Sequence, residues 1–98
     1  MAVETKLFDA SEYMESEDAQ AEYLSIVMED GDLEEIKHAL GIIARARGMT
    51  AIARDAGVTR EALYKALSDK GDPKFSTLLG VVKALGLKFE LKKIEAAE

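Results

Sequence analysis

The chain has 98 residues, of which 48% are hydrophobic and 33% are charged. This length favours one domain, and the composition argues against a disordered tail and a membrane-spanning protein. There is no Cys and a single His, His38, which excludes a disulfide framework and sites built from Cys or several His. The first residues lack the basic and then apolar pattern of a signal peptide. We expect a cytoplasmic binding module with no membrane partner, and not an enzyme, with no cofactor, no metal and no catalytic residues.

The net charge of −6 is divided unevenly along the chain. Residues 1–38 carry twelve acidic and two basic groups, a net charge of −10, whereas residues 39–98 carry seven acidic and eleven basic groups, a net charge of +4. A basic module can bind a nucleic acid because it displaces the counterions condensed on the phosphates. An acidic segment is repelled by DNA and suits a basic protein partner. The alternative is that these acidic residues only form a solvated helix face.

Five helices are predicted, and the first two lie in the more acidic half of the chain. Ser16 is a favourable N-cap for the first helix, and Gly31 is a favourable C-cap. The predicted buried face of this helix consists of Ala19, Tyr23, Ile26 and Val27. Asp32 can cap the second helix, which spans residues 33–47. Its predicted buried stripe consists of Leu33, Ile36, Leu40 and Ile43. His38 lies outside this stripe and is expected to be exposed.

Two short helices and a longer one follow. Gly48 closes the second helix, and Thr50 is the predicted cap of a third helix that ends at residue 56. Thr59 is the predicted cap of a fourth helix that ends near residue 68. A loop at residues 70–73 precedes a fifth helix over residues 75–85. The predicted apolar face of this last helix consists of Leu78, Leu79, Val82 and Leu85.

Residues 87–92 alternate between apolar and polar side chains, which predicts a short C-terminal β-strand. A strand cannot stand alone, because its backbone groups need hydrogen-bond partners. The sequence offers two partners. One is the segment near Lys6, Leu7 and Phe8 of the same chain, and the other is the equivalent strand of a second chain.

The third and fourth helices have the pattern of a helix-turn-helix. Ile52 and the small Ala53 face inward, so that the second helix can approach closely. Gly57 stands where the turn needs a positive φ, and Val58 plugs the corner. The predicted core positions of the second helix of the motif are Ala62, Leu63, Ala66 and Leu67. The alternative is an ordinary bundle in which these two helices are merely packed together.

The remaining positions of the second motif helix form a candidate DNA-reading face. They are Thr59, Arg60, Glu61, Tyr64, Lys65 and Ser68. Arg60 could pair with guanine in bidentate fashion, and Lys65 could contact guanine or phosphate. Tyr64 offers a hydroxyl to phosphate and a ring to a thymine methyl group. Thr50 and the amides beside it open a helix N-terminus, which favours phosphate.

Several stretches of the chain resemble the addiction-module antidote proteins. The central stretches are residues 44–50 and 59–68, followed by residues 73–75, 77–78 and 83–87. Residues 7–10, the region around Tyr13 and residues 28–32 resemble the leader of that family. These antidotes are HigA-like antitoxins with a lambda-repressor-like helix-turn-helix. The resemblance covers roughly residues 7–92 and is more specific than a bare helix-turn-helix.

The resemblance implies a mainly α fold: a five-helix lambda-repressor-like helix-turn-helix domain with an N-terminal helical extension and a short C-terminal β-strand. We divide it into an acidic arm and helix, residues 1–31, and a DNA-binding unit, residues 32–94. It also implies a homodimer that binds double-stranded DNA at its own operator and neutralises a RelE/ParE-like toxin. Family members often have Gln at the position of Ala51 for a phosphate contact, and Thr50 and Arg54 are the candidates to replace it.

Acidic residues are the candidate contacts for the basic toxin, on electrostatic grounds alone. The three selected are Glu15, Glu22 and Glu29. Two other functions stay open from the sequence. One is a phage-type transcriptional regulator without a toxin partner, and the other is a protein-interaction domain that has lost DNA binding.

Overall fold

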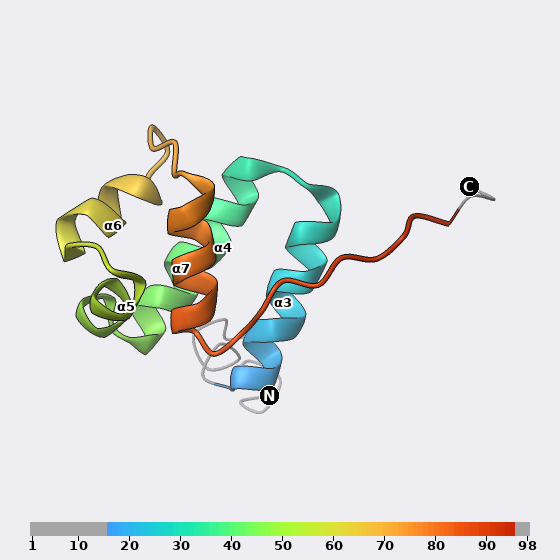
Figure 1. The fold of residues 1–98 in the computed structure, drawn as a ribbon, viewed down its shortest axis with the longest axis horizontal. Coiled ribbons are helices and arrows are strands. Elements are labelled where there is room, and N and C mark those ends of the chain that lie inside the picture. The colour runs from blue at the N-terminus through green and yellow to red at the C-terminus, as the bar shows by residue number, and fades with distance from the viewer. Residues whose placement is uncertain (1–15, 96–98) are drawn as a thin grey trace, which may run out of the picture.

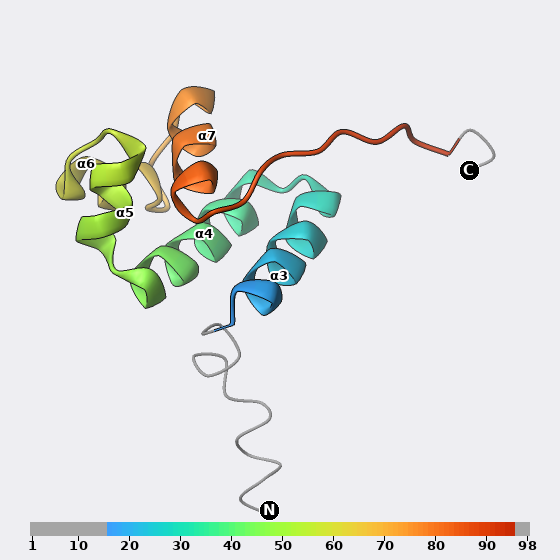
Figure 2. The ribbon, with the colours of Figure 1, turned by 60° about the horizontal axis from the view of Figure 1, so that its bottom comes forward.

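The computed structural model describes residues 16–95, and these are mainly helical, as predicted. The helices, labelled as in Figure 1, are α3 (Glu17–Asp30), α4 (Leu33–Arg47), α5 (Met49–Ala56), α6 (Arg60–Ala66) and α7 (Phe75–Ala84). Figures 1 and 2 show α5 and α6 together at one end of the molecule, with α3 on the other side of α4. After α7 the chain runs past α3 as an extended segment.

Local capping chemistry sets most of the helix boundaries. Ser16 Oγ accepts a hydrogen bond from Ala19 N at 3.2 Å, and Asp32 Oδ1 accepts one from Glu34 N at 3.0 Å. Gly31, between α3 and α4, has a left-handed φ of 76°. The predicted caps at Ser16, Asp32 and Gly31 are therefore confirmed.

The predicted cap at Thr50 is wrong. Gly48 closes α4 with a φ of 110° and is also the N-cap residue of α5, so α5 begins two residues earlier than predicted, at Met49. The first turn of α5 has no side-chain cap hydrogen bond, and Thr50 lies within that turn. The fourth helix also ends earlier than predicted, at Ala66, and Ser68 Oγ bonds to the carbonyl oxygen of Lys65 at 2.7 Å.

The core lies where α4, α5, α6 and α7 meet. Seven of the core positions predicted from the sequence are buried in the structure: Leu40, Ile43, Ile52, Ala53, Leu63, Val82 and Leu85. Three predicted core positions are wrong: Ile26 is 61% exposed, Leu33 is 40% exposed, and Ala62 is also exposed. In α3 the inward face is turned toward Gln20 and Leu24 instead, because Leu24 joins the core beside α4.

One arginine joins α3, α4 and α7. Arg47 Nε donates to Gln20 Oε1 at 2.9 Å, and Arg47 Nη2 donates to the carbonyl oxygen of Leu85 at 2.8 Å. Gln20 is 1% exposed, so this polar pair lies inside the molecule. A buried amide needs a hydrogen-bond partner, and the guanidinium supplies one from a fixed direction. The pairing of Gln20 with Arg47 explains how a polar residue of α3 can face the core.

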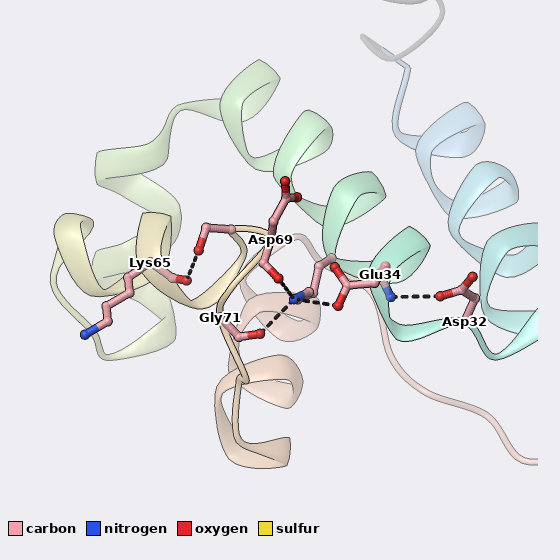
Figure 3. A network of polar contacts seen from close by, with 7 residues as sticks. Asp32, Glu34, Lys65, Asp69 and Gly71 are labelled. Carbon is pink, nitrogen blue, oxygen red and sulfur yellow. Dashed lines mark hydrogen bonds and ion pairs between the residues drawn. The ribbon is translucent and has the colours of Figure 1, made fainter.

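The buried Lys37 of α4 binds the loop between α6 and α7. Figure 3 labels its three contact partners, Glu34, Asp69 and Gly71. Lys37 is only 1% exposed, and its Nζ lies 3.1 Å from the carbonyl oxygen of Asp69 and 2.7 Å from that of Gly71. The third contact is an ion pair with Glu34 Oε2 at 3.0 Å. An ammonium group has three N–H donors, and each has an acceptor here. Lys37 therefore ties α4 to the loop that follows α6.

The predicted C-terminal β-strand is not formed within the described residues. Residues 85–95 contain no strand, although residues 87–92 keep the alternating sequence. The candidate partner near Lys6 lies outside the described residues. The physical reason for the difference is that a strand is defined by its partner, and residues 16–95 offer this segment none.

Candidate nucleic-acid interface

A tight turn joins α5 to α6. We name these two helices and their turn the α5–α6 unit. Gly57 has a left-handed φ of 80°, as predicted, and its N–H donates to the carbonyl oxygen of Arg54 at 3.1 Å. Val58 N donates to the carbonyl oxygen of Ala53 at 3.0 Å, and the side chain of Val58 packs against the core. Thr59 then caps α6, with Oγ1 accepting from Ala62 N at 3.0 Å.

Helix α7 packs closely against α5 of the α5–α6 unit. Gly80 lies so close to α5 that a Cβ atom there would be 3.0 Å from the carbonyl oxygen of Ala56. On the other side, Leu63 of α6 is fully buried against the core that contains Ala53. The inner faces of both short helices are thus fixed, and the outer face of α6 is left to solvent.

Four predicted site residues lie on this outer face. Arg60, Glu61, Tyr64 and Lys65 are all exposed. The guanidinium carbon of Arg60 lies 5.6 Å from the centre of the Tyr64 ring, a distance at which a cation and an aromatic face attract each other. This contact holds the Arg60 head group beside the phenol without burying it.

Arg60 and Tyr64 also line an open hollow of about 350 Å³. Its remaining lining residues are Arg45, Gly48, Met49 and Thr50. The hollow therefore joins the last turn of α4, the first turn of α5 and the outer face of α6. Its lining residues carry two guanidinium groups, one aliphatic hydroxyl and one phenol, and these are groups that bind phosphate oxygens.

Arg45 is a site residue that the sequence reasoning missed. It lies two positions before Arg47, and positions two apart on a helix point to nearly opposite sides. Arg47 turns inward, and Arg45 therefore turns outward to the hollow. Gly41, one turn earlier, leaves room for it, since a Cβ atom there would be 3.3 Å from Arg45 Nη1. The opposite phases of two arginines in one predicted helix could have revealed this residue.

Three of the other predicted DNA-binding residues, Arg54, Thr59 and Ser68, lie outside the hollow. Arg54 forms an exposed ion pair with its neighbour Asp55 at 3.3 Å. Thr59 caps α6 through its hydroxyl oxygen, and its O–H can still donate. Ser68 donates its hydroxyl to the end of α6. Thr50 does reach the hollow, although it is not the cap that the sequence predicted.

Two of the three acidic candidates, Glu22 and Glu29, belong to α3 and do not line the hollow. Glu22 and Glu29 are exposed and lie seven residues apart, and Ile26 between them is 61% exposed. This spacing places all three on one helix face. Glu15 lies outside the described residues. Figure 2 shows α3 on one side of α4 and α5 and α6, which supply most of the lining of the hollow, on the other.

Residues 16–95 contain neither a cluster of metal ligands nor a helix that could span a membrane. No three His, Asp or Glu side chains of this part of the chain come together in a way that could hold a metal ion. In the same residues, each helix is too short or too polar to cross a bilayer.

Comparison with known proteins places the whole helical region in one family. Residues 4–93 match a family described as "probable addiction module antidote protein". An uncharacterised protein of Haemophilus influenzae is 47% identical over 93 residues, which cover 95% of this chain and 96% of that protein. No solved structure matches significantly. On the family match and the extent of the similarity, the chain belongs to the probable addiction module antidote proteins.

Proposed function

We propose that this protein is the antitoxin of a type II toxin–antitoxin module, a cytoplasmic HigA-like antitoxin that also represses its own operator. The family match supports the antidote role, and an antidote implies a toxin as its partner. The observation that carries the DNA-binding role is the hollow in which Arg45, Thr50, Arg60 and Tyr64 meet. On this proposal the α5–α6 unit is a lambda-repressor-like helix-turn-helix, and α6 is the helix that enters the major groove.

The residues of the hollow would divide the work of binding. Arg45 and Thr50 lie at the junction of α4 and α5, where they can hold a phosphate at the entrance to the groove. Arg60 lies on α6 itself and can pair with the O6 and N7 atoms of guanine. Tyr64, beneath the Arg60 head group, orients it and offers its hydroxyl to the backbone. Lys65, on the same exposed helix, adds a contact to a base or a phosphate.

A dimer would place two such helices in successive major grooves, about 34–36 Å apart. The acidic face of α3 would then bind the toxin, which we propose to be a small basic RelE/ParE-like protein. Glu22 and Glu29 supply the charge for this contact, and Ile26 supplies an exposed apolar group between them. Because α3 lies across α4 from α5 and α6, one antitoxin could hold DNA and toxin together.

The DNA-binding role is tested by substitution in the hollow. The affinity of Arg45→Ala and Arg60→Ala for DNA from the protein's own upstream region is measured by fluorescence anisotropy. Arg60→Ala should cost about 1–3 kcal/mol and relax the preference at one base pair. Arg45→Ala should weaken binding to all sequences alike, as the loss of a phosphate contact does. Lys93→Ala is the control, because it removes the same charge from the exposed C-terminal segment. Equal affinities for all three variants would contradict the proposal.

The toxin-binding role is tested with the product of the neighbouring gene. The double variant Glu22→Lys/Glu29→Lys should slow association with a basic toxin at low salt, because charges at an interface act mainly on the association rate. Glu61→Lys makes the same kind of charge reversal on α6 and should leave that rate unchanged. A plain transcriptional regulator would bind no such product. Deletion of α3 is a poorer test, since it also removes Leu24 from the core.

A further inference from the structure

The segment after α7 is extended and carries exposed apolar side chains. Leu87, Phe89 and Leu91 alternate with Lys88, Glu90 and Lys92, so an extended backbone puts the apolar groups on one face and the charges on the other. Leu91 is 97% exposed, and Phe89 is 38% exposed. Exposed leucine and phenylalanine next to each other on one face of a segment indicate a surface that another molecule covers.

Leu87 and Phe89, at the start of this segment, contact α7, whereas the backbone of the later residues has no partner among residues 16–95. Leu87 N donates to the carbonyl oxygen of Val82 at 3.0 Å, and the ring of Phe89 lies 5.8 Å from that of Phe75. Beyond these contacts an open hollow of about 1000 Å³ separates the segment from α3. The backbone groups of residues 88–95 form no hydrogen bond with any other residue in the described part of the chain. The segment is therefore held in position with its backbone available for pairing.

We propose that the segment pairs with the same segment of a second copy, as an antiparallel two-stranded ribbon centred on Phe89. In this register Phe89 faces Phe89 of the partner copy. Lys88 of each copy faces Glu90 of the other, and Leu87 of each copy faces Leu91 of the other. Every apolar residue then meets an apolar residue, and both charged pairs are of opposite sign, which stabilises a cross-strand pair.

The neighbouring antiparallel registers lack this complementarity. Centring on Glu90 would place Glu90 opposite Glu90 and Lys88 opposite Lys92, and like charges directly opposite each other are destabilising. Centring on Leu91 would place Phe89 opposite Lys93 and Lys88 opposite Ile94. The side-chain sequence is thus self-complementary about one residue, which favours a second copy over an unrelated partner as the occupant.

The ribbon also explains the exposure of Leu91. Leu87 is half-buried at the edge of the core, where it packs against the end of α7. The register places Leu91 of one copy beside Leu87 of the other, so the most exposed leucine of the segment is covered at the partner's core edge. The dimer in the proposed operator binding rests on such an interface. The interface itself is tested without DNA or toxin, so either proposal can fail alone.

The charge pairs are tested by sedimentation velocity across protein concentration. Lys88→Glu and Glu90→Lys each turn both attractive pairs into repulsive ones and should raise the dimer dissociation constant about 10-fold. Mixing the two variants should restore dimers, because every pair then joins Glu to Lys. Lys92→Glu is the control, since Lys92 faces Gly86 in this register. Both variants change exposed side chains, and circular dichroism checks that they fold.

The register is tested by single cysteines, because the chain has none of its own. Phe89→Cys should form an intermolecular disulfide on mild oxidation, since residue 89 faces its own copy and Cβ atoms in opposite positions lie about 4.5–5.5 Å apart. Leu91→Cys should not, because its two copies would be about 13 Å apart along the ribbon. A monomeric wild type, a segment that becomes ordered only with toxin, or single charge variants that dimerise like the wild type would each overturn the proposal.

Discussion

Replacing Lys37 with Met tests whether the buried ammonium of α4 holds the α6–α7 loop. Met keeps most of the aliphatic stem and removes the charge and all three donors. The carbonyl oxygens of Asp69 and Gly71 lose their partner, and so does the carboxylate of Glu34. The loop would then be tied to α4 by apolar contacts alone.

The expected loss is the difference between two opposing effects. Each hydrogen bond from a charged group to a loop carbonyl contributes about 1.5–3 kcal/mol. Against this, the variant no longer has to desolvate an ammonium that is 1% exposed, which costs several kcal/mol in a protein interior. The ion pair adds little, because the Glu34 side chain is 62% exposed and screened by water. We expect a net loss of about 2 kcal/mol, or a fall of about 10 °C in Tm for a chain of this size.

The assay is urea unfolding followed by circular dichroism at 222 nm. Lys70→Met is the matched control, because Lys70 is exposed in the same loop and should change stability by less than about 0.5 kcal/mol. Glu34→Gln should cost at most about 1 kcal/mol. Equal stability of Lys37→Met and Lys70→Met, or a larger loss of stability in Glu34→Gln than in Lys37→Met, would contradict a stabilising role of the buried ammonium.

Substitutions at three further positions follow from the packing. Gly71→Ala should lower Tm clearly, because its Cβ would clash with the backbone carbonyl oxygens of Lys65 and Ala66, and an unchanged Tm would contradict this close approach. Gly57→Val should cost about 1–2 kcal/mol of folding free energy because φ is 80°, whereas Gly57→Asn should cost less. Urea unfolding of both variants tests this, since backbone strain predicts the smaller loss for Asn and a steric clash does not. Arg47→Leu should increase amide hydrogen exchange in α3, since it removes the hydrogen bond from Arg47 to the buried side-chain oxygen of Gln20, and unchanged protection would show that this hydrogen bond is dispensable.

The parts of the fold that depend on local chemistry could be predicted from the sequence. Ser16, Asp32 and Thr59 cap helices because a short polar side chain can reach an amide two or three residues ahead. Gly31 and Gly57 end helices because only glycine adopts a left-handed φ without strain. These interactions lie within a few residues, so the sequence contains both partners side by side.

The parts that depend on distant partners could not be predicted. The burial of Lys37 requires carbonyl oxygens that come from 32 and 34 residues away, and nothing beside it in the sequence indicates them. The inward phase of α3 was wrong at Ile26 because Gln20 finds its partner in Arg47 on another helix. The C-terminal strand was not formed for the same reason, because no other segment of residues 16–95 in the same chain pairs with it.

The candidate site was predicted in part. The exposed residues of α6 follow from the helical period once Leu63 is assigned to the core. Arg45 was missed because it belongs to the preceding helix, and only the bend at Gly48 brings it beside Arg60 and Tyr64. Thr50 was selected for a cap that it does not form, yet it lines the same hollow.

The proposed binding of this protein to its own operator is tested by a salt titration of DNA binding. A labelled duplex from its own upstream region is compared with a scrambled duplex of the same length and composition. We predict tighter binding to the upstream duplex, with the logarithm of the association constant falling linearly with the logarithm of salt concentration by about 0.9 per phosphate contacted. Equal affinity for the two duplexes, or no binding even with the neighbouring gene's product present, would contradict the claim.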